Sequence, residues 1–381
     1  MCGVKKIFSQ LIFPSSLLAT TIVGAGMFAL PYLFNKVGVA TGLFYLFFFG
    51  AVFALIHLMY ADIIVRTPEN KRFSGYAKIY LGQFGHWSSI FMTIFGALLV
   101  LTIYLILSVS FVKLILPTAP DIYIISIFWL LSSLAIFFSI NELAMSDFFI
   151  FLAMVALIFI VFGFGFSGGL EKIKTIPLFD FSNIFLPFGA VLFSMYGRSA
   201  IPALLGYFRN NGQSPVKGKW PIIIGSVAPV FIYAFFIFGI LGLSNGVSQD
   251  AVSGLVKNLS PIILWILGTL GIISLWSTYI IIGRDIKKSL EHDFNIPLVF
   301  SGLVVVVAPI LFYMAGFQNF LQLVEFIGAV IIGLEGIFIV LMWLRASKIA
   351  SEHKFINKLN PLLVGLLLLV FIGGILYKVI E

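Results

Sequence analysis

The sequence predicts an all-α integral membrane protein with about 11 transmembrane helices, on the grounds of composition, segment length and two matching helix interruptions. Of the 381 residues, 61% are hydrophobic and 10% are charged, and the mean hydropathy is +1.14. A soluble domain of this composition would leave most of its apolar surface in water. The chain therefore has little room for a domain outside the membrane.

The individual spans follow from the apolar runs, because about 20 helical residues cross the hydrocarbon core of a bilayer. The predicted spans are 11–34, 40–64, 87–116, 121–140, 147–167, 185–208, 220–243, 260–283, 296–315, 319–345 and 361–379. The first run is too long for a cleaved signal peptide, so it counts as a span. Two connecting segments predict short helices, an amphipathic cytoplasmic one at 73–85 and an outer one at 247–258.

Basic residues set the predicted orientation, because Lys and Arg concentrate in cytoplasmic loops. With the N-terminus in the cytoplasm, 16 of the 23 Lys and Arg residues fall on the cytoplasmic side and 6 on the outer side, while Arg198 lies inside a span. We therefore expect a multi-pass protein of the cell (plasma or inner) membrane, with its C-terminus outside. The same distribution accounts for the net charge of +8 without nucleic acid as a partner.

Two hexapeptides of the same pattern, Gly-x-x-Ala-aliphatic-Pro, interrupt the first and the sixth span. The first hexapeptide runs from Gly26 to Pro31, and the second runs from Gly197 to Pro202. Glycine and proline are poor residues for a helix that must satisfy its own backbone in lipid. Paired interruptions at corresponding positions in two halves are typical of the substrate site of a transporter.

The spacing of the two hexapeptides also predicts how the chain is organised. Each repeat has five spans, and because five is an odd number the second repeat is an inverted copy of the first. Repeat one covers about 11–167 and repeat two about 185–345, followed by an additional helix at about 361–379. The whole chain, 1–381, is then a single transmembrane transporter domain.

The chemistry of a break lies mainly in its backbone. An unwound turn at Gly24 and Gly26 leaves free C=O groups at the end of one half-helix and free N–H groups at the start of the next. The N–H end attracts a carboxylate, and the C=O end attracts an ammonium group or Na+. A zwitterionic amino acid needs both kinds of partner. The alternative is that these residues only kink or pack the helices, but the pairing of the breaks favours a binding site.

Three stretches resemble a known family. Thr20–Tyr32 (TTIVGAGMFALPY) resembles the first-helix signature of the amino acid/auxin permease and aromatic amino acid permease group, and Phe193–Pro202 (FSMYGRSAIP) is similar to its sixth-helix signature. Ser74–Tyr76 and Leu81–Gly85 resemble its second cytoplasmic loop. The group belongs to the amino acid–polyamine–organocation superfamily. The resemblance implies a LeuT-like fold, with helices one and six broken and substrate held between helices one, three, six and eight.

The resemblance also implies which residues form the site. The implied contacts with the amino and carboxyl groups of the substrate come from the first helix, and the sixth-helix signature and the third helix supply the remainder. These residues are Thr21, Gly24, Ala25, Gly26, Tyr104, Phe193, Ser194, Tyr196 and Gly197. Sodium-coupled relatives carry small hydroxyl residues on the eighth helix, for which Ser274, Ser277 and Thr278 are the candidates here. Their register differs from the adjacent hydroxyl pair of the family.

Charged and titratable groups inside a span are costly and point to function. Arg198, in the second break, is predicted to pair with a substrate carboxylate or to replace a coupling cation, and a tie to Glu335 is the other hypothesis. In the structural alternative, Arg198 snorkels toward water. Glu335 and His57 are also candidate ion-coupling residues, and His57 could carry a proton because histidine titrates near neutral pH. A hydrogen-bonded packing histidine is the alternative and the more favoured interpretation of His57.

The sequence therefore predicts a secondary active transporter that moves amino acids by alternating access, coupled to H+ or Na+, with H+ favoured. A non-transporting amino acid sensor on the same scaffold is the alternative. An enzyme is not predicted, because the polar groups inside the spans form no recognisable catalytic set; these are His57, Asp62, Arg198 and Glu335. No metal site or cofactor beyond the coupling ion is expected, since the chain has one cysteine and no His-Glu-x-x-His motif. The expected partners are the amino acid and the lipid bilayer, and the sequence does not specify an oligomeric state.

Overall fold

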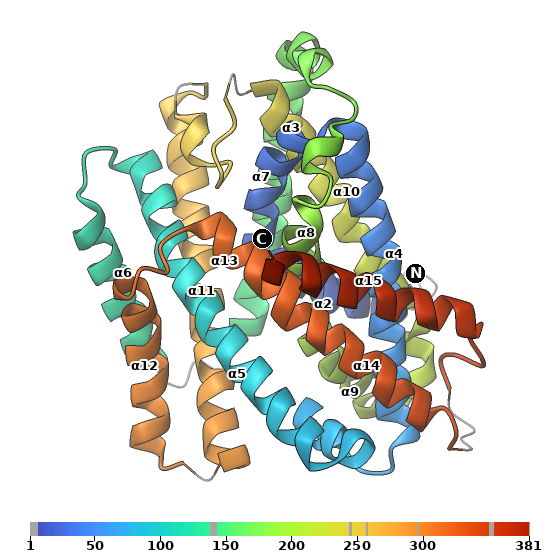
Figure 1. Cartoon of the computed structure of the whole chain (residues 1–381). Coiled ribbons are helices and arrows are strands. Elements are labelled where there is room, and N and C mark those ends of the chain that lie inside the picture. Colours follow the sequence, from blue (N-terminus) through green and yellow to red (C-terminus); the bar gives the residue numbers. More distant parts are fainter. Residues whose placement is uncertain are drawn as a thin grey trace.

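The computed structural model describes residues 7–137, 143–243, 246–256, 258–294, 296–349 and 354–380. Within these ranges the regular secondary structure is entirely helical (Figure 1). Lys5, Lys6 and Lys257, which contribute to the predicted charge distribution, lie outside the described residues, as does the predicted end of the fourth span at 138–140.

The first span is interrupted, as predicted. It consists of η1 (Phe8–Ile12), α2 (Phe13–Ile22), η2 (Ala25–Ala29) and α3 (Leu30–Val37). The rest of the first half is formed by α4 (Val39–Arg66), α5 (Phe73–Ile115), α6 (Asp121–Ala135) and α7 (Leu143–Thr175).

The second half begins with another interrupted span, made of α8 (Pro187–Ser194), η4 (Arg198–Ala200) and α9 (Ile201–Asn210). It continues with α10 (Lys219–Leu243), α11 (Pro261–Phe294), α12 (Leu298–Met314), α13 (Phe320–Phe326), η7 (Ile327–Ile332) and α14 (Gly333–Ala346). The last helix, α15 (Pro361–Ile380), crosses α14 on the outside of the bundle (Figure 1).

The helices match the predicted spans. By length and composition, seven helices of the described chain can cross a membrane, and the bent pair Phe8–Ile22 and Ala25–Val37, at 54° to each other, makes one more. Three shorter apolar helices occupy the positions of the fourth, fifth and ninth predicted spans. The prediction of a multi-pass all-α membrane protein is therefore confirmed.

Three boundaries differ from the prediction for local physical reasons. The helix α11 continues to Phe294, past the predicted end at residue 283, because the polar residues that follow the apolar run remain helical. The segment predicted as an amphipathic helix is the first part of α5, and Gly82 with φ 78° separates it from the span. The prediction of a helix at 247–258 was wrong for the described residues of this segment, which form a 3-10 turn, η6 (Ser253–Leu255), between non-helical residues.

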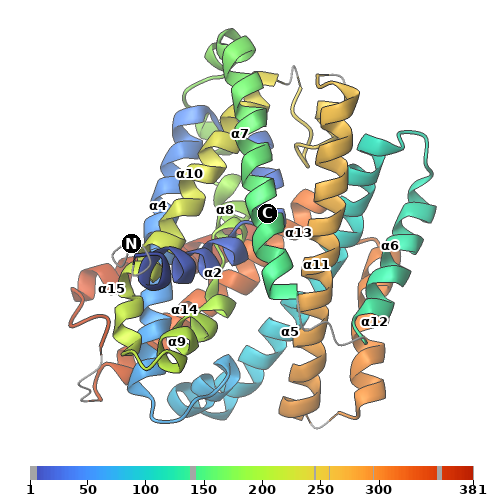
Figure 2. The same ribbon diagram turned by 180° about the vertical axis from the view of Figure 1, so that it is seen from behind.

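Small residues let the helices that surround the site pack closely. A Cβ atom added to Gly165 of α7 would lie 2.1 Å from the carbonyl oxygen of Gly239 on α10, and one added to Gly169 would lie 2.1 Å from that of Gly242. Such contacts between helix backbones are typical of membrane bundles, where small residues replace the hydrophobic effect as the basis of packing. The two helices lie side by side in both views (Figures 1 and 2).

A buried charge network holds the connection between α14 and α15 against α4. The carboxylate of Asp62 accepts hydrogen bonds from Arg66 Nε at 2.7 Å, from Trp343 Nε1 at 2.9 Å and from the Phe355 N–H at 2.7 Å. Arg66 also donates to the carbonyl oxygen of Ile349 at 2.9 Å. Because both charges are buried and fully paired, this network fixes the end of α4.

Candidate functional site

The two predicted breaks exist and lie against each other. Helix α2 ends at Ile22, and Gly24 has the extended dihedral angles φ −144° and ψ −153° before η2 begins. Helix α8 ends at Ser194, and Gly197 has φ −143° and ψ 13° before η4 begins. Each interrupted span therefore presents the carboxyl end of one half-helix and the amino end of the next.

Gly26 and Gly197 are required because other atoms approach them closely, and not because of a positive φ. A Cβ atom on Gly26 would lie 2.7 Å from Ser194 Oγ and 2.8 Å from Ser194 Cα. A Cβ atom on Gly197 would lie 2.5 Å from Ile22 Cγ1 and 2.8 Å from Leu18 Cδ1. The first break therefore contacts the end of α8, and the second break contacts the end of α2.

Tyr233 of α10 reaches both breaks, and the sequence analysis did not identify it. Its hydroxyl oxygen lies 2.7 Å from the carbonyl oxygen of Ile22 and 2.8 Å from that of Ser194. The residue is fully buried. The only signal in the sequence is a hydroxyl group inside an otherwise apolar span, which does not reveal its partners.

His57 of α4 contacts the second break directly. The Gly197 N–H donates to His57 Nε2 at 3.2 Å, and His57 Nδ1 lies 2.8 Å from the Ser226 hydroxyl. Ser226 donates its own proton to the carbonyl oxygen of Ile222 at 2.8 Å, so it accepts from His57 Nδ1. This network assigns the neutral imidazole with its proton on Nδ1.

Arg198 is paired with Glu335 of α14. Arg198 Nε lies 2.8 Å from Glu335 Oε2, and its terminal nitrogen lies 3.2 Å from Oε1, so the contact is bidentate. The Tyr196 hydroxyl donates to the same carboxylate at 2.9 Å. The guanidinium carbon lies 4.1 Å from the ring centroid of Phe73, a cation–π contact. The geometry agrees with the hypothesis that Arg198 pairs with Glu335.

These groups surround a small cavity between α4, the second break and α14. Arg198 and Glu335 line it on one side and His57 on another, and the full lining is Phe53, Ile56, His57, Tyr196, Arg198, Ile332, Glu335, Gly336 and Ile339. Its walls thus come from the second, sixth and tenth predicted spans, which are α4, the interrupted span α8–α9 and the span that ends in α14. Tyr196 was predicted to contact substrate from the resemblance, and Arg198 from its charge inside a span. In the structure both contact Glu335, on the side of the second break that faces α4 and α14.

The other predicted residues lie in two groups. Gly24, Ala25, Phe193 and Ser194 are at the two breaks, and Thr21 in the last turn of α2 is exposed and donates to the Leu17 carbonyl at 2.9 Å. Tyr104 is buried on α5, which packs against η2.

The predicted sodium-site hydroxyls lie on α11, which packs against α5, α6, α7 and α12. Thr278 donates its hydroxyl proton to the carbonyl oxygen of Ser274 at 2.8 Å, which is within its own helix, and Ser277 is buried.

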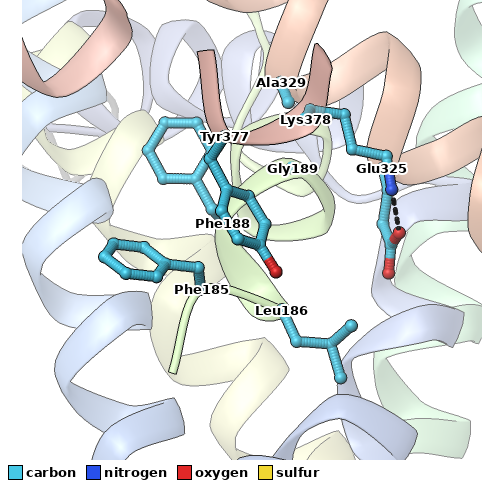
Figure 3. Close-up of a pocket in the computed structure, with 8 residues that line it drawn as sticks. All are labelled: Phe185, Leu186, Phe188, Gly189, Glu325, Ala329, Tyr377 and Lys378. Atoms are coloured by element: carbon cyan, nitrogen blue, oxygen red, sulfur yellow. Dashed lines mark hydrogen bonds and ion pairs between the residues drawn. The ribbon is translucent and has the colours of Figure 1, made fainter. Parts of the chain in front are cut away.

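A second small cavity lies where α15 meets α8 and α13 (Figure 3). Its polar contact is the ion pair between Lys378 Nζ and Glu325 Oε2 at 2.9 Å. The aromatic side chains of Phe185, Phe188 and Tyr377 surround it. The ion pair attaches α15 to α13.

Two solved structures have a similar fold. One is MhsT in complex with L-phenylalanine, with 15% sequence identity over 96% of this chain and 97% of that chain and a TM-score of 0.63. The other is the Eremococcus coleocola manganese transporter in complex with an aromatic bis-isothiourea substituted compound, with 15% identity over 96% of this chain and 86% of that chain and a TM-score of 0.56. The predicted LeuT-like fold is thereby confirmed.

The family comparison addresses the class of protein. No curated protein sequence matches the chain. The model of the tryptophan/tyrosine permease family matches residues 9–380, which is nearly the whole chain. The prediction of a permease rather than an enzyme is confirmed, whereas the narrower assignment to the amino acid/auxin permease group stays a prediction. The chain belongs to the tryptophan/tyrosine permease family.

Proposed function

We propose that this permease, a secondary transporter of amino acids, carries an aromatic amino acid by alternating access and is driven by H+. The observation that supports the proposal is the contact between the two breaks. Four half-helix ends meet there, the amino ends of η2 and η4 and the carboxyl ends of α2 and α8. Such a junction can bind both charged groups of a zwitterion without a charged side chain.

The carboxylate of the substrate would be held at the start of η2. The N–H groups of Ala25 and Gly26 are the first of that helix, so they have no acceptor in the preceding turn. The ammonium group would be held by carbonyl lone pairs at the end of α8, near Phe193. In this arrangement the backbone binds the groups that all amino acids share.

Aromatic side chains next to the breaks support an aromatic substrate. The ring of Phe28 on η2 packs edge-on against Phe111 of α5 at 5.2 Å and against Phe236 of α10 at 5.7 Å. Phe193 is half-buried at the end of α8, and Tyr104 is buried on α5. Aromatic rings favour offset and edge-on contacts with one another, so a Trp, Tyr or Phe side chain suits this lining. The family name and the phenylalanine bound by MhsT agree with this substrate class.

Exposure differs between the two ends of the site. Along α2, Thr21 is exposed and Ser16 and Thr20 are half-buried, so the accessible face of this helix includes three hydroxyl groups. At the other end, Val252 next to η6 is buried, and the Ser110 hydroxyl donates to Asp250 at 2.5 Å. We infer a conformation open on the side of the N-terminus, which the charge distribution assigns to the cytoplasm.

We propose Glu335 as the group that takes the coupling proton. Its carboxylate holds Arg198 of the second break, so protonation would release helix six from α14. His57 already makes two hydrogen bonds as a neutral imidazole, so it is the less suitable proton site. A buried carboxylate that is hydrogen-bonded to the second break therefore supports H+ as the coupling ion.

Uptake into proteoliposomes tests the proposal. Labelled tryptophan, tyrosine, phenylalanine and leucine are offered with an inward H+ gradient, an inward Na+ gradient or neither. We expect accumulation of at least one aromatic amino acid under the H+ gradient alone, with leucine as the weaker substrate. Accumulation only under the Na+ gradient would refute the coupling assignment. Thermal stabilisation by an aromatic amino acid without any uptake would instead indicate a sensor.

A further inference from the structure

The carboxyl ends of two half-helices converge on a single hydroxyl group. Ile22 is the last residue of α2 and Ser194 is the last residue of α8, and both carbonyl oxygens lie within 2.8 Å of Tyr233 Oη. A phenol has one proton, so it can donate fully to only one of the two acceptors at a time. Tyr233 is 0% exposed, so water does not supply a second donor from the surface.

The two converging carbonyl groups need either a cation or a hydrogen-bond donor between them. Each helix carboxyl end carries a partial negative charge, and two such ends facing one point repel each other. In the interior of a membrane bundle an unsatisfied carbonyl is costly, so the pair requires either a bound cation or a hydrogen-bond donor. Tyr233 of α10 supplies a neutral donor at this point.

The same helix also supports α2 at its other end. A Cβ atom added to Gly225 of α10 would lie 2.7 Å from the carbonyl oxygen of Ser15 and 2.9 Å from Leu18 Cβ. Helix α2 therefore lies directly on α10 near Gly225, and it is hydrogen-bonded to α10 at its end through Tyr233. Of these two attachments, only the hydrogen bond also includes the second break.

We propose that Tyr233 is a positioning residue that couples the two interrupted helices, with its hydroxyl occupying the place that a carbonyl-bound cation would otherwise take. When the two carbonyls are close together, the Tyr233 hydroxyl contacts both and thereby holds the end of α2 next to the end of α8. When α2 moves away, the Tyr233 hydroxyl keeps its proton and donates its hydrogen bond to the Ser194 carbonyl alone. The strength of this bond then sets how far α2 is docked, and it does so without contact with the substrate. This inference rests on the proposed transport function.

Cysteine labelling measures the docking of α2 independently of transport. The chain has one cysteine, so Cys2→Ser gives a cysteine-free background in which Ser16→Cys places a reporter on the half-buried stripe of α2. The rate of its reaction with a water-soluble maleimide is compared between Tyr233, Tyr233→Phe and Tyr279→Phe. Tyr279 is the matched control, because it is equally buried but lies on α11 against Phe128 of α6.

We expect Tyr233→Phe to raise the labelling rate on the order of tenfold, which corresponds to the loss of about one hydrogen bond. Tyr279→Phe should leave the rate unchanged. The maximal uptake rate of Tyr233→Phe should fall by a similar factor while KM changes less than twofold, because the hydroxyl does not touch the substrate. Labelling of the Tyr233 protein should be the same in Na+, K+ and choline. An unchanged labelling rate in Tyr233→Phe, or a rate that depends on Na+, would overturn the inference.

A second replacement covers the case in which Tyr233→Phe does not fold. Incorporation of 3-fluorotyrosine at position 233 keeps the ring and the hydroxyl and makes the hydroxyl a stronger donor. It should lower the labelling rate, and an unchanged or higher rate would contradict the inference. If the protein with Tyr233 took up no aromatic amino acid, the proposed function would fail, but the labelling comparison would still decide the role of Tyr233.

Discussion

The ion pair between Arg198 and Glu335 allows a quantitative test of how the second break is held. We consider the replacements Arg198→Met, Glu335→Met and the double replacement, since methionine approximates the length of both side chains. The Arg198 side chain is 9% exposed and that of Glu335 is 4% exposed, so each single replacement leaves the other charge buried without its partner. Breaking a buried ion pair in this way costs about 3–5 kcal/mol.

The double replacement should behave differently from the sum of the single ones. Replacing both members of a buried ion pair by apolar residues of similar volume is often neutral or stabilising by about 1–4 kcal/mol. We therefore expect the double variant to unfold within about 2 kcal/mol of the parent, against a sum of about 6–10 kcal/mol for the two single changes. The assay is the free energy of unfolding from SDS titration in mixed micelles, measured for all four proteins at one pH.

Function separates the two hypotheses for Arg198. If Glu335 carries the coupling proton, the double variant should still bind an aromatic amino acid and exchange it across the membrane, but it should not accumulate it under an H+ gradient. Additive losses of stability would refute the reasoning about the ion pair. A stable double variant that no longer binds any amino acid would restore the hypothesis that Arg198 pairs with the substrate carboxylate.

Three further predictions follow from the geometry. Gly26→Ala should abolish uptake, because its Cβ atom would lie 2.7 Å from Ser194 Oγ, whereas Gly163→Ala, with no atom within 4 Å, should keep normal uptake. His57→Gln should transport with an unchanged pH dependence, because the proposed proton site is Glu335 and His57 makes its hydrogen bonds as a neutral ring, and a shifted pH profile of uptake would contradict this. Asp62→Asn should lower the free energy of unfolding by about 3–5 kcal/mol, measured by the same SDS titration, because it leaves the buried Arg66 charge without its partner. An equal loss in Arg66→Met with no further loss in the double variant would support the pairing.

The helices could be predicted because the length of an apolar run is a local property of the sequence. The break in the first span was predictable for the same reason, since Gly24, Gly26 and Pro31 weaken a helix wherever it packs. The end of α11 was not, because helix propensity continues after hydrophobicity stops, as Lys287 and Lys288 show. The turn at Ser253–Leu255 is held by the Asp250 carboxylate, which accepts from the hydroxyl and the N–H of Ser253, and residue types alone do not reveal this.

The contacts of the site were harder to predict because they join residues far apart in the chain. Arg198 and Glu335 could be proposed as a pair, since two opposite charges inside spans have few other partners. The hydrogen bond between the His57 ring and the Gly197 N–H could not be predicted, because every residue except proline has a backbone N–H and the sequence does not show which of them a histidine meets. Tyr233 was missed for a related reason: its two acceptors are main-chain carbonyls, which every residue has.

The two breaks are held by contacts of different strength, and this difference has a mechanistic consequence. The second break is fixed by a bidentate ion pair to α14 and by the bond from Gly197 to His57 of α4. The end of α2 depends on the shared proton of Tyr233 and on packing against α10. Because hydrogen bonds between charged groups are about twice as strong as neutral ones, α2 should detach before helix six does. Under the proposed coupling through Glu335, α2 would move first, the interrupted span α8–α9 would follow once the Arg198–Glu335 pair is neutralised, and the proton would act on this second step.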